Sequence, residues 1–205
     1  MANFNFEVSF NEELFKGLSD SKQIVIQGLA FCYTNLTITE QSTIGIKSVE
    51  AAIRYFIKEY LAPTGYYQAR TRIMSHLLVH NWVRYHGEQE QFLPMVHLDQ
   101  KLTETLILVA LGMSNSTMAS IFGMSLKGIE TRLSSLFDRF DIETGRKQKE
   151  NPRVLLVVSA LLRGNIDKRA LAKYYEMTTL DKLKRIIEDP HLFRMKLADI
   201  NQYIG

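Results

Sequence analysis

The stretch that decides the fold runs from Leu102 to Lys147 and reads LTETLILVALGMSNSTMASIFGMSLKGIETRLSSLFDRFDIETGRK. Its apolar residues recur at helical spacing and predict three helices, over 103–112, 115–122 and 126–140. Ser114-Asn115-Ser116 offer an N-cap for the short helix, Ser125 caps the long one, and Gly123 suits the left-handed conformation that ends a helix. A short helix, a tight turn containing glycine and a longer helix form the helix-turn-helix plan, whose second helix reads the major groove of DNA.

Most of the remaining chain also shows helical spacing of its apolar residues. The other predicted helices cover 20–31, 36–43, 47–61, 67–85, 152–163, 167–175, 179–188 and 194–203. Asn3–Phe10 instead alternates apolar and polar residues, which favours a short strand or an ordered N-terminal arm. The segment His86–His97 is the most loop-like interior stretch and the best candidate linker. The predicted fold class is therefore all-α.

An internal repeat accompanies the helical pattern. Shifting the chain by 80 residues pairs Asn35–Gly65 with Asn115–Gly145 without a gap, and the apolar stripes of the two long helices coincide. Upstream, matching Gly28 to Gly112 requires four extra residues in the first unit, at about Leu29–Tyr33. Duplication accounts for this pattern, although amphipathic helices also resemble one another without it.

The second unit resembles the LuxR/GerE-type helix-turn-helix domain, which is also the C-terminal module of NarL/FixJ-type regulators. The matching residues are Leu102-Thr103-Glu104, Gly112-Met113-Ser114-Asn115, Ala119, Gly123-Met124-Ser125, Ile129-Glu130-Thr131, Leu136-Phe137, Arg139-Phe140 and Ile142. The following Asn151–Gly164 resembles the family's fourth helix, which often carries dimer contacts. Arg132 departs from the family's usual His, Asp138 and Asp141 add negative charge, and Lys147–Asn151 is extra.

The repeat and the resemblance together predict two tandem four-helix helix-turn-helix domains with a C-terminal helical extension. The expected divisions are 1–17 for an N-terminal arm, 18–90 for a degenerate helix-turn-helix domain, 91–165 for the LuxR-type domain and 166–205 for the extension.

The outer face of helix 126–140 is the predicted DNA-binding surface. Its candidate residues, with the cap, are Ser125, Lys127, Gly128, Thr131, Arg132, Ser135 and Arg139. Lys127 near the helix start and the Ser125 cap suit phosphate contacts, and the resemblance assigns the DNA backbone to Arg139. Thr131 and Arg132 lie one turn into the helix, where base edges are read.

The first unit is more degenerate, since Thr43 replaces the turn glycine and Gly45 replaces the capping serine. Its outward face is predicted to present Ala52 together with the candidate DNA-binding residues Lys47, Ser48, Ala51, Arg54 and Lys58. Two interpretations stay open: a second DNA-reading head, or a decayed copy kept as a packing or dimer surface.

Charge is distributed unevenly, although the net charge is only +3. Residues 1–21 carry four acidic groups against one basic group, whereas Gly45–Arg72 carries five basic groups against two acidic ones. From Arg163 to the end there are nine basic and six acidic residues. The acidic arm therefore masks local positive charge that suits a polyanionic partner.

Composition excludes several classes of protein. With 46% hydrophobic and 23% charged residues, the chain is too apolar for a disordered protein and too polar for a membrane protein. The longest apolar stretch, Val154–Leu162, falls far short of the ~18 residues that a membrane span requires. No basic residue precedes an apolar core at the N-terminus, and the single Cys32 excludes a disulfide framework. A soluble, cytoplasmic protein is expected.

Catalytic and metal-binding patterns are weak in this sequence. It has no Gly-rich phosphate loop, GxSxG motif or paired carboxylates, so we expect no enzyme and no cofactor. His76 and His80 share a helical face but lack a third ligand, which favours packing over a metal site. Trp82 and Tyr85 suit base stacking less well than core or interface packing.

The sequence thus predicts a bacterial-type transcriptional regulator that binds specific double-stranded DNA without cofactor or membrane. The protein is also expected to form a homodimer or to bind a partner regulator. The alternative is a helical protein–protein interaction module that binds another regulator or RNA polymerase, because Asp138, Asp141 and Glu143 lie close to the predicted recognition helix.

Overall fold

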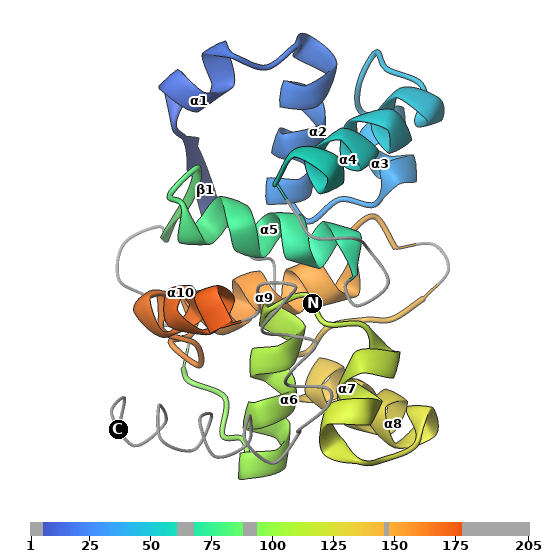
Figure 1. Cartoon of the computed structure of the whole chain (residues 1–205), viewed down its shortest axis with the longest axis vertical. Coiled ribbons are helices and arrows are strands. Elements are labelled where there is room, and N and C mark those ends of the chain that lie inside the picture. The colour runs from blue at the N-terminus through green and yellow to red at the C-terminus, as the bar shows by residue number, and fades with distance from the viewer. Residues whose placement is uncertain (1–5, 61–67, 88–93, 146–147, 178–205) are drawn as a thin grey trace.

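The computed structural model describes residues 6–60, 68–87, 94–145 and 148–177, and it is mostly helical with one small sheet (Figure 1). The strands are β1 (Phe6–Phe10) and β2 (Val83–Gly87). The helices are α1 (Glu12–Lys16), α2 (Asp20–Ala30), α3 (Asn35–Glu40), α4 (Ile46–Tyr60), α5 (Ala69–Val79), α6 (Gln100–Ala110), α7 (Asn115–Phe122), α8 (Leu126–Arg139), α9 (Pro152–Leu162) and α10 (Lys168–Met177).

The two strands form an antiparallel pair in which Phe10 lies opposite Val83. The expected N-terminal strand is therefore confirmed over Phe6–Phe10, and residues 3–5 of it lie outside the described residues. The expected helix over 67–85 is wrong beyond Val79. Helix α5 stops because Asn81 adopts a left-handed conformation, with φ of 58°, and reverses the chain. Val83 then enters the core, fully buried, and the strand that it begins pairs with β1. Helix α1 was not predicted.

Helix positions recur along the chain at the predicted offset. Helices α2, α3 and α4 begin eighty residues before α6, α7 and α8, respectively. Helices α5 and α9 follow as the fourth helix of each set, so α2–α5 form the first unit and α6–α9 the second. Figure 1 shows α2–α4 at one end of the molecule and α6–α8 at the other, with α5 and α9 between them.

The four-residue insertion expected at Leu29–Tyr33 is absent, because the eighty-residue offset already holds for α2 and α6. The residue that corresponds to Gly112 is Cys32, and both are left-handed, with φ of 75° and 61°. Gly28 instead lies inside α2, where a Cβ would come within 2.4 Å of Ile38 Cγ1 on α3. Matching the two glycines was wrong because a cysteine adopts the conformation that normally favours glycine.

Each unit's fourth helix begins against the turn of the other unit. Gln68, the N-cap of α5, donates its backbone N–H to Gly112 O at 2.6 Å. Asn151, the N-cap of α9, donates in the same way to Cys32 O at 2.5 Å. Thr34, which caps α3, adds a further backbone bond to Lys149 O at 2.8 Å. These hydrogen bonds link the two units, and the buried apolar residues of both units form one continuous core.

The remaining expectations divide between the described residues and those outside them. Of the expected linker, His86 and Gly87 belong to β2, and the described residues 94–97 are irregular. Helix α10 confirms the first helix of the C-terminal extension, while the expected helices 179–188 and 194–203 lie outside the described residues. Within the described part of the chain, no helix combines the length and the apolar character needed to cross a membrane.

Candidate nucleic-acid interface

Helices α7 and α8 are joined by a short turn whose conformation follows from its residues. The Ser114 side chain caps α7 by accepting from Thr117 N at 3.1 Å. Gly123 ends α7 in the left-handed conformation, with φ of 62° and ψ of 40°. Ser125 then caps α8 by accepting from Gly128 N at 3.1 Å. All three residues perform the roles expected from the sequence.

The inner face of α8 holds it against the rest of the second unit. Ile129, Leu133 and Leu136 are buried, as the predicted stripe requires. Helix α7 contributes the buried Met118 and Ile121 to the same core. Because this stripe fixes the rotation of α8, the opposite face and the first turn are left to solvent.

The predicted DNA-binding residues of the second unit separate into two groups. Ser125, Lys127, Thr131 and Arg139 are exposed, whereas Gly128, Arg132 and Ser135 are half-buried. The Lys127 side chain is 87% exposed, and its Nζ lies 3.9 Å from the Glu130 carboxylate. The four exposed residues therefore lie on the N-cap and first two turns of α8 and on its last turn.

Arg132 does not lie on the freely exposed face where the sequence pattern put it. Its guanidinium donates to Thr105 Oγ1 on α6 at 3.4 Å and lies 4.8 Å from the centre of the Phe122 ring. Arg139 is exposed, but it donates to His97 O at 2.8 Å. Both arginines thus connect α8 to neighbouring segments of its own unit.

The hydroxyl groups on the same face are occupied within the helix. Thr131 Oγ1 donates to Lys127 O at 2.9 Å, and Ser135 Oγ donates to Thr131 O at 3.1 Å. Such bonds to a carbonyl one turn back are common for Thr and Ser in helices. The hydroxyl oxygens still accept hydrogen bonds, and the Thr131 methyl group offers an apolar contact.

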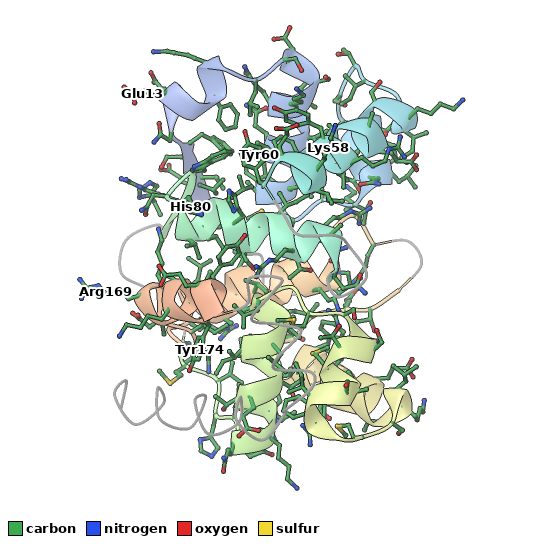
Figure 2. The ribbon with its side chains drawn as sticks, viewed as in Figure 1. Glu13, Lys58, Tyr60, His80, Arg169 and Tyr174 are labelled. Carbon is green, nitrogen blue, oxygen red and sulfur yellow. The ribbon has the colours of Figure 1, made fainter. Side chains whose placement is uncertain are left out.

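The first unit presents its candidate residues more openly. Lys47, Ser48, Ala51, Arg54 and Lys58 are all exposed (Lys58 is labelled in Figure 2).

Ala52, however, is 4% exposed and belongs to the core, so its expected place on the outward face is wrong. The turn before α4 also differs from its counterpart, because no residue in 41–45 has a positive φ. The Ser42 hydroxyl donates to Ile38 O at 2.5 Å instead.

Two exposed apolar residues were missed by sequence reasoning. Ile46 and Leu126 are the first residues of α4 and α8, eighty residues apart, and they are 41% and 53% exposed. Each falls outside the buried stripe of its helix, and that is the signal that could have identified it. An apolar side chain at this position suits contact with a thymine methyl group or with an apolar protein surface.

The two long helices differ in the charge of their exposed faces. On α8, Lys127 and Arg139 are balanced by Glu130 and Asp138. On α4, three exposed basic residues stand against two exposed acidic ones, the set being Lys47, Arg54, Lys58, Glu50 and Glu59. The basic excess among these exposed residues therefore lies on α4 of the first unit, where it favours contact with a polyanion.

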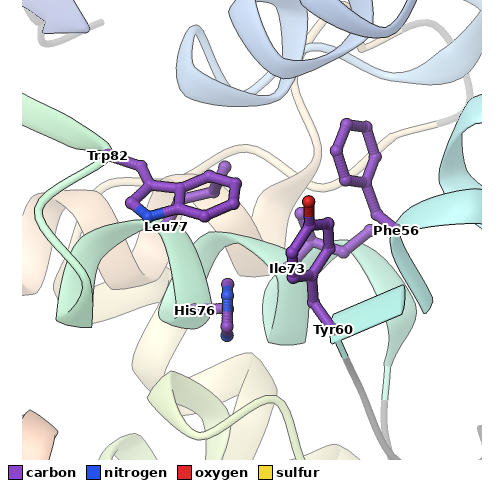
Figure 3. Close-up of a pocket in the computed structure, with 6 residues that line it drawn as sticks. All are labelled: Phe56, Tyr60, Ile73, His76, Leu77 and Trp82. Atoms are coloured by element: carbon purple, nitrogen blue, oxygen red, sulfur yellow. The ribbon is translucent and has the colours of Figure 1, made fainter. Parts of the chain in front are cut away.

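A narrow aromatic pocket, too tightly packed to hold a water molecule, lies between α4, α5 and the start of β2 (Figure 3). Its lining residues are Phe56, Tyr60, Ile73, His76, Leu77 and Trp82. Tyr60 and Trp82 meet edge to face, with ring centres 5.1 Å apart, and His76 Nδ1 lies 3.0 Å from the Tyr175 hydroxyl. His76 and Trp82 therefore pack as expected. Among the described residues, no three His, Cys, Asp or Glu side chains form a cluster suited to a metal ion.

Burial, together with the charges of the nearby His80 and Arg72, lowers the pKa of His76 to about 4. Between pH 6.5 and pH 4 the unfolded chain therefore binds a proton that the folded chain does not, so stability falls as the pH falls. Because the imidazole is partly exposed, we expect His76 to contribute a decrease of only about 1 kcal/mol in the free energy of unfolding between pH 7 and pH 5.

The check is urea unfolding at both pH values for the wild type and for His76→Gln, whose amide can keep the bond to Tyr175. The variant is expected to lose less stability on acidification. An equal loss in the two proteins would rule out His76 as the titrating group.

The interface thus offers an exposed lysine, backbone N–H groups at the start of α8 and an apolar first residue. Such a surface can hold a phosphate and approach the floor of a groove. In comparisons with known proteins, no family model, no curated protein and no solved structure matches this chain.

Proposed function

We propose that this chain is a sequence-specific binder of duplex DNA that regulates transcription, with α7 and α8 acting as a helix-turn-helix of the LuxR/GerE type. The observation that carries the proposal is the capped α7–turn–α8 arrangement, in which the start of α8 is open to solvent while its inner stripe is buried. The second helix of such a pair enters the major groove with its first residues. The resemblance to the LuxR/GerE-type domain rests partly on the turn and on α8, including Gly123-Met124-Ser125 and Ile129-Glu130-Thr131.

Each exposed residue at the start of α8 has a separate role in this proposal. Lys127 and the first backbone N–H groups of α8 contact a phosphate. Thr131, one turn further along, contacts a base edge, and Leu126 packs against a thymine methyl group. Arg132 acts as a positioning residue that orients α8 against α6 through Thr105. In the first unit, Lys47, Arg54 and Lys58 supply additional phosphate contacts.

Lys127→Ala tests the proposal directly. Duplexes enriched by in vitro selection would be titrated by fluorescence anisotropy at several salt concentrations. Loss of one phosphate contact is expected to weaken binding on all sequences and to reduce the slope of log affinity against log salt by about 1.

The matched control is Arg169→Ala, which removes an exposed positive charge from α10, on the opposite edge of the view in Figure 2. This control is expected to bind as the wild type does. Identical salt slopes for Lys127→Ala and the wild type would exclude the assigned contact, and the absence of any enriched duplex would overturn the function.

A second candidate function is supported by the exposed apolar side chains. Leu36, Ile46 and Leu126 are 62%, 41% and 53% exposed, and the charges on α8 are balanced. Such a surface suits a helical segment of another regulator or of RNA polymerase. Failure to enrich DNA, together with direct binding of a purified partner that is lost in Leu126→Asp, would favour this function over the first.

A further inference from the structure

We infer that a single chain carries both halves of a two-fold DNA reader and occupies one inverted duplex site as a monomer. This inference rests on the proposed function and specifies its target and its stoichiometry. It replaces a homodimer with two different units of one chain.

The first support is the equivalence of the two units at the level of the backbone. Tyr33 N donates to Gly28 O at 2.8 Å, and Met113 N donates to Leu108 O at 3.0 Å, each eighty residues from its counterpart. The caps of α3 and α7 agree as well, because Thr34 and Ser114 both accept from the N–H three residues later. The units are therefore alike in the parts that orient α4 and α8.

The second support is that the contacts between the units are reciprocal. The turn of the first unit, at Cys32, accepts from the start of α9, while the turn of the second, at Gly112, accepts from the start of α5. Units related by translation along the chain would use two different surfaces for their contact. The same surface used in both directions is the mark of a two-fold relation. We therefore place a pseudo-two-fold axis between α5 and α9.

The third support is that the contact across this pseudo-two-fold axis forms within one chain. Helices α5 and α9 pack against each other, and Val157, Val158 and Ser159 of α9 are at most 1% exposed. Backbone also approaches backbone, since a Cβ on Gly112 would lie 2.7 Å from Arg72 Cα. The fourth helices thus contact each other within one chain, so a second copy is not required.

The arrangement in space agrees with a shared target. Figure 1 shows α3–α4 and α7–α8 at opposite ends of the α5–α9 layer and displaced toward the same side of it. A protein with two-fold symmetry reads half-sites that are inverted relative to each other. The corresponding exposed residues differ, with Ala51 and Arg54 standing where the second unit has Thr131 and Ser134. The expected target is therefore an inverted site with unequal halves.

The test compares three duplexes built from the in vitro selected sequence: the inverted site, the same halves in direct order, and one half alone. Affinity is measured by anisotropy, and the number of chains per duplex by sedimentation. We expect one chain per inverted duplex, bound at least about tenfold more tightly than the other two because both units engage at once.

Variants locate the two units on the DNA. In hydroxyl-radical footprints, Lys47→Ala and Lys127→Ala are expected to weaken protection in opposite halves of the site, while Arg169→Ala changes neither half. Two chains per inverted duplex, or equal affinity for the direct order, overturns this inference and leaves the proposed function intact. If no duplex is enriched, the proposed function fails and the inference fails with it.

Discussion

Gly112→Ala is expected to lower the free energy of unfolding by about 2–5 kcal/mol, through backbone strain and overpacking together. Gly112 has a φ of 75°, a conformation that costs an L-residue energy. An added Cβ would also lie 2.7 Å from both N and Cα of Arg72. Because these contacts are with backbone, a side-chain rotation cannot relieve them, so α5 must move away from the second unit.

Gly145→Ala is the matched control, because Gly145 is exposed and an added Cβ there would meet no atom within 4 Å. Its stability is expected to stay within about 0.5 kcal/mol of the wild type. Urea unfolding followed by circular dichroism measures both variants. Equal stability of Gly112→Ala and the wild type would contradict the close approach of α5 to this turn.

The second unit could be predicted well from the sequence because its signals are local. Ser114, Gly123 and Ser125 each determine the conformation of one or two neighbouring residues, and each behaves as predicted. The apolar stripe that includes Ile129 and Leu136 likewise fixes the rotation of α8. Such signals act within one turn of helix, where sequence spacing and spatial distance agree.

The remaining features depend on contacts between distant segments. Val83 begins a strand because β1, more than seventy residues earlier, supplies its partner. Cys32 takes the left-handed conformation at a turn that Asn151 bonds from the other unit. Arg132 has the spacing of an exposed residue, but the hydroxyl of Thr105 draws it inward. A single sequence contains no local signal for these partners.

Arg153→Ala is expected to lower the free energy of unfolding by about 2–4 kcal/mol, because it leaves a buried backbone carbonyl and a half-buried amide oxygen without their donor. The Arg153 guanidinium donates to Met113 O at 2.9 Å and to Asn115 Oδ1, and it thereby joins the start of α9 to the start of α7. Burial lowers its pKa to about 10, so the group is still charged at neutral pH. Met113 is fully buried, so water does not replace the lost donor easily.

Arg153→Lys separates the loss of charge from the loss of geometry. A lysine keeps the positive charge but lacks the planar fork that serves two acceptors at once, so we expect it to recover only part of the lost stability. Arg169→Ala removes an exposed arginine and is expected to change stability by less than about 0.5 kcal/mol. Urea unfolding ranks the three variants by their free energy of unfolding.

If Arg153→Lys is as stable as the wild type, a single positive charge is enough at this junction and the bidentate contact is unimportant. If Arg153→Ala also equals the wild type, α9 does not depend on this contact to hold α7 in place.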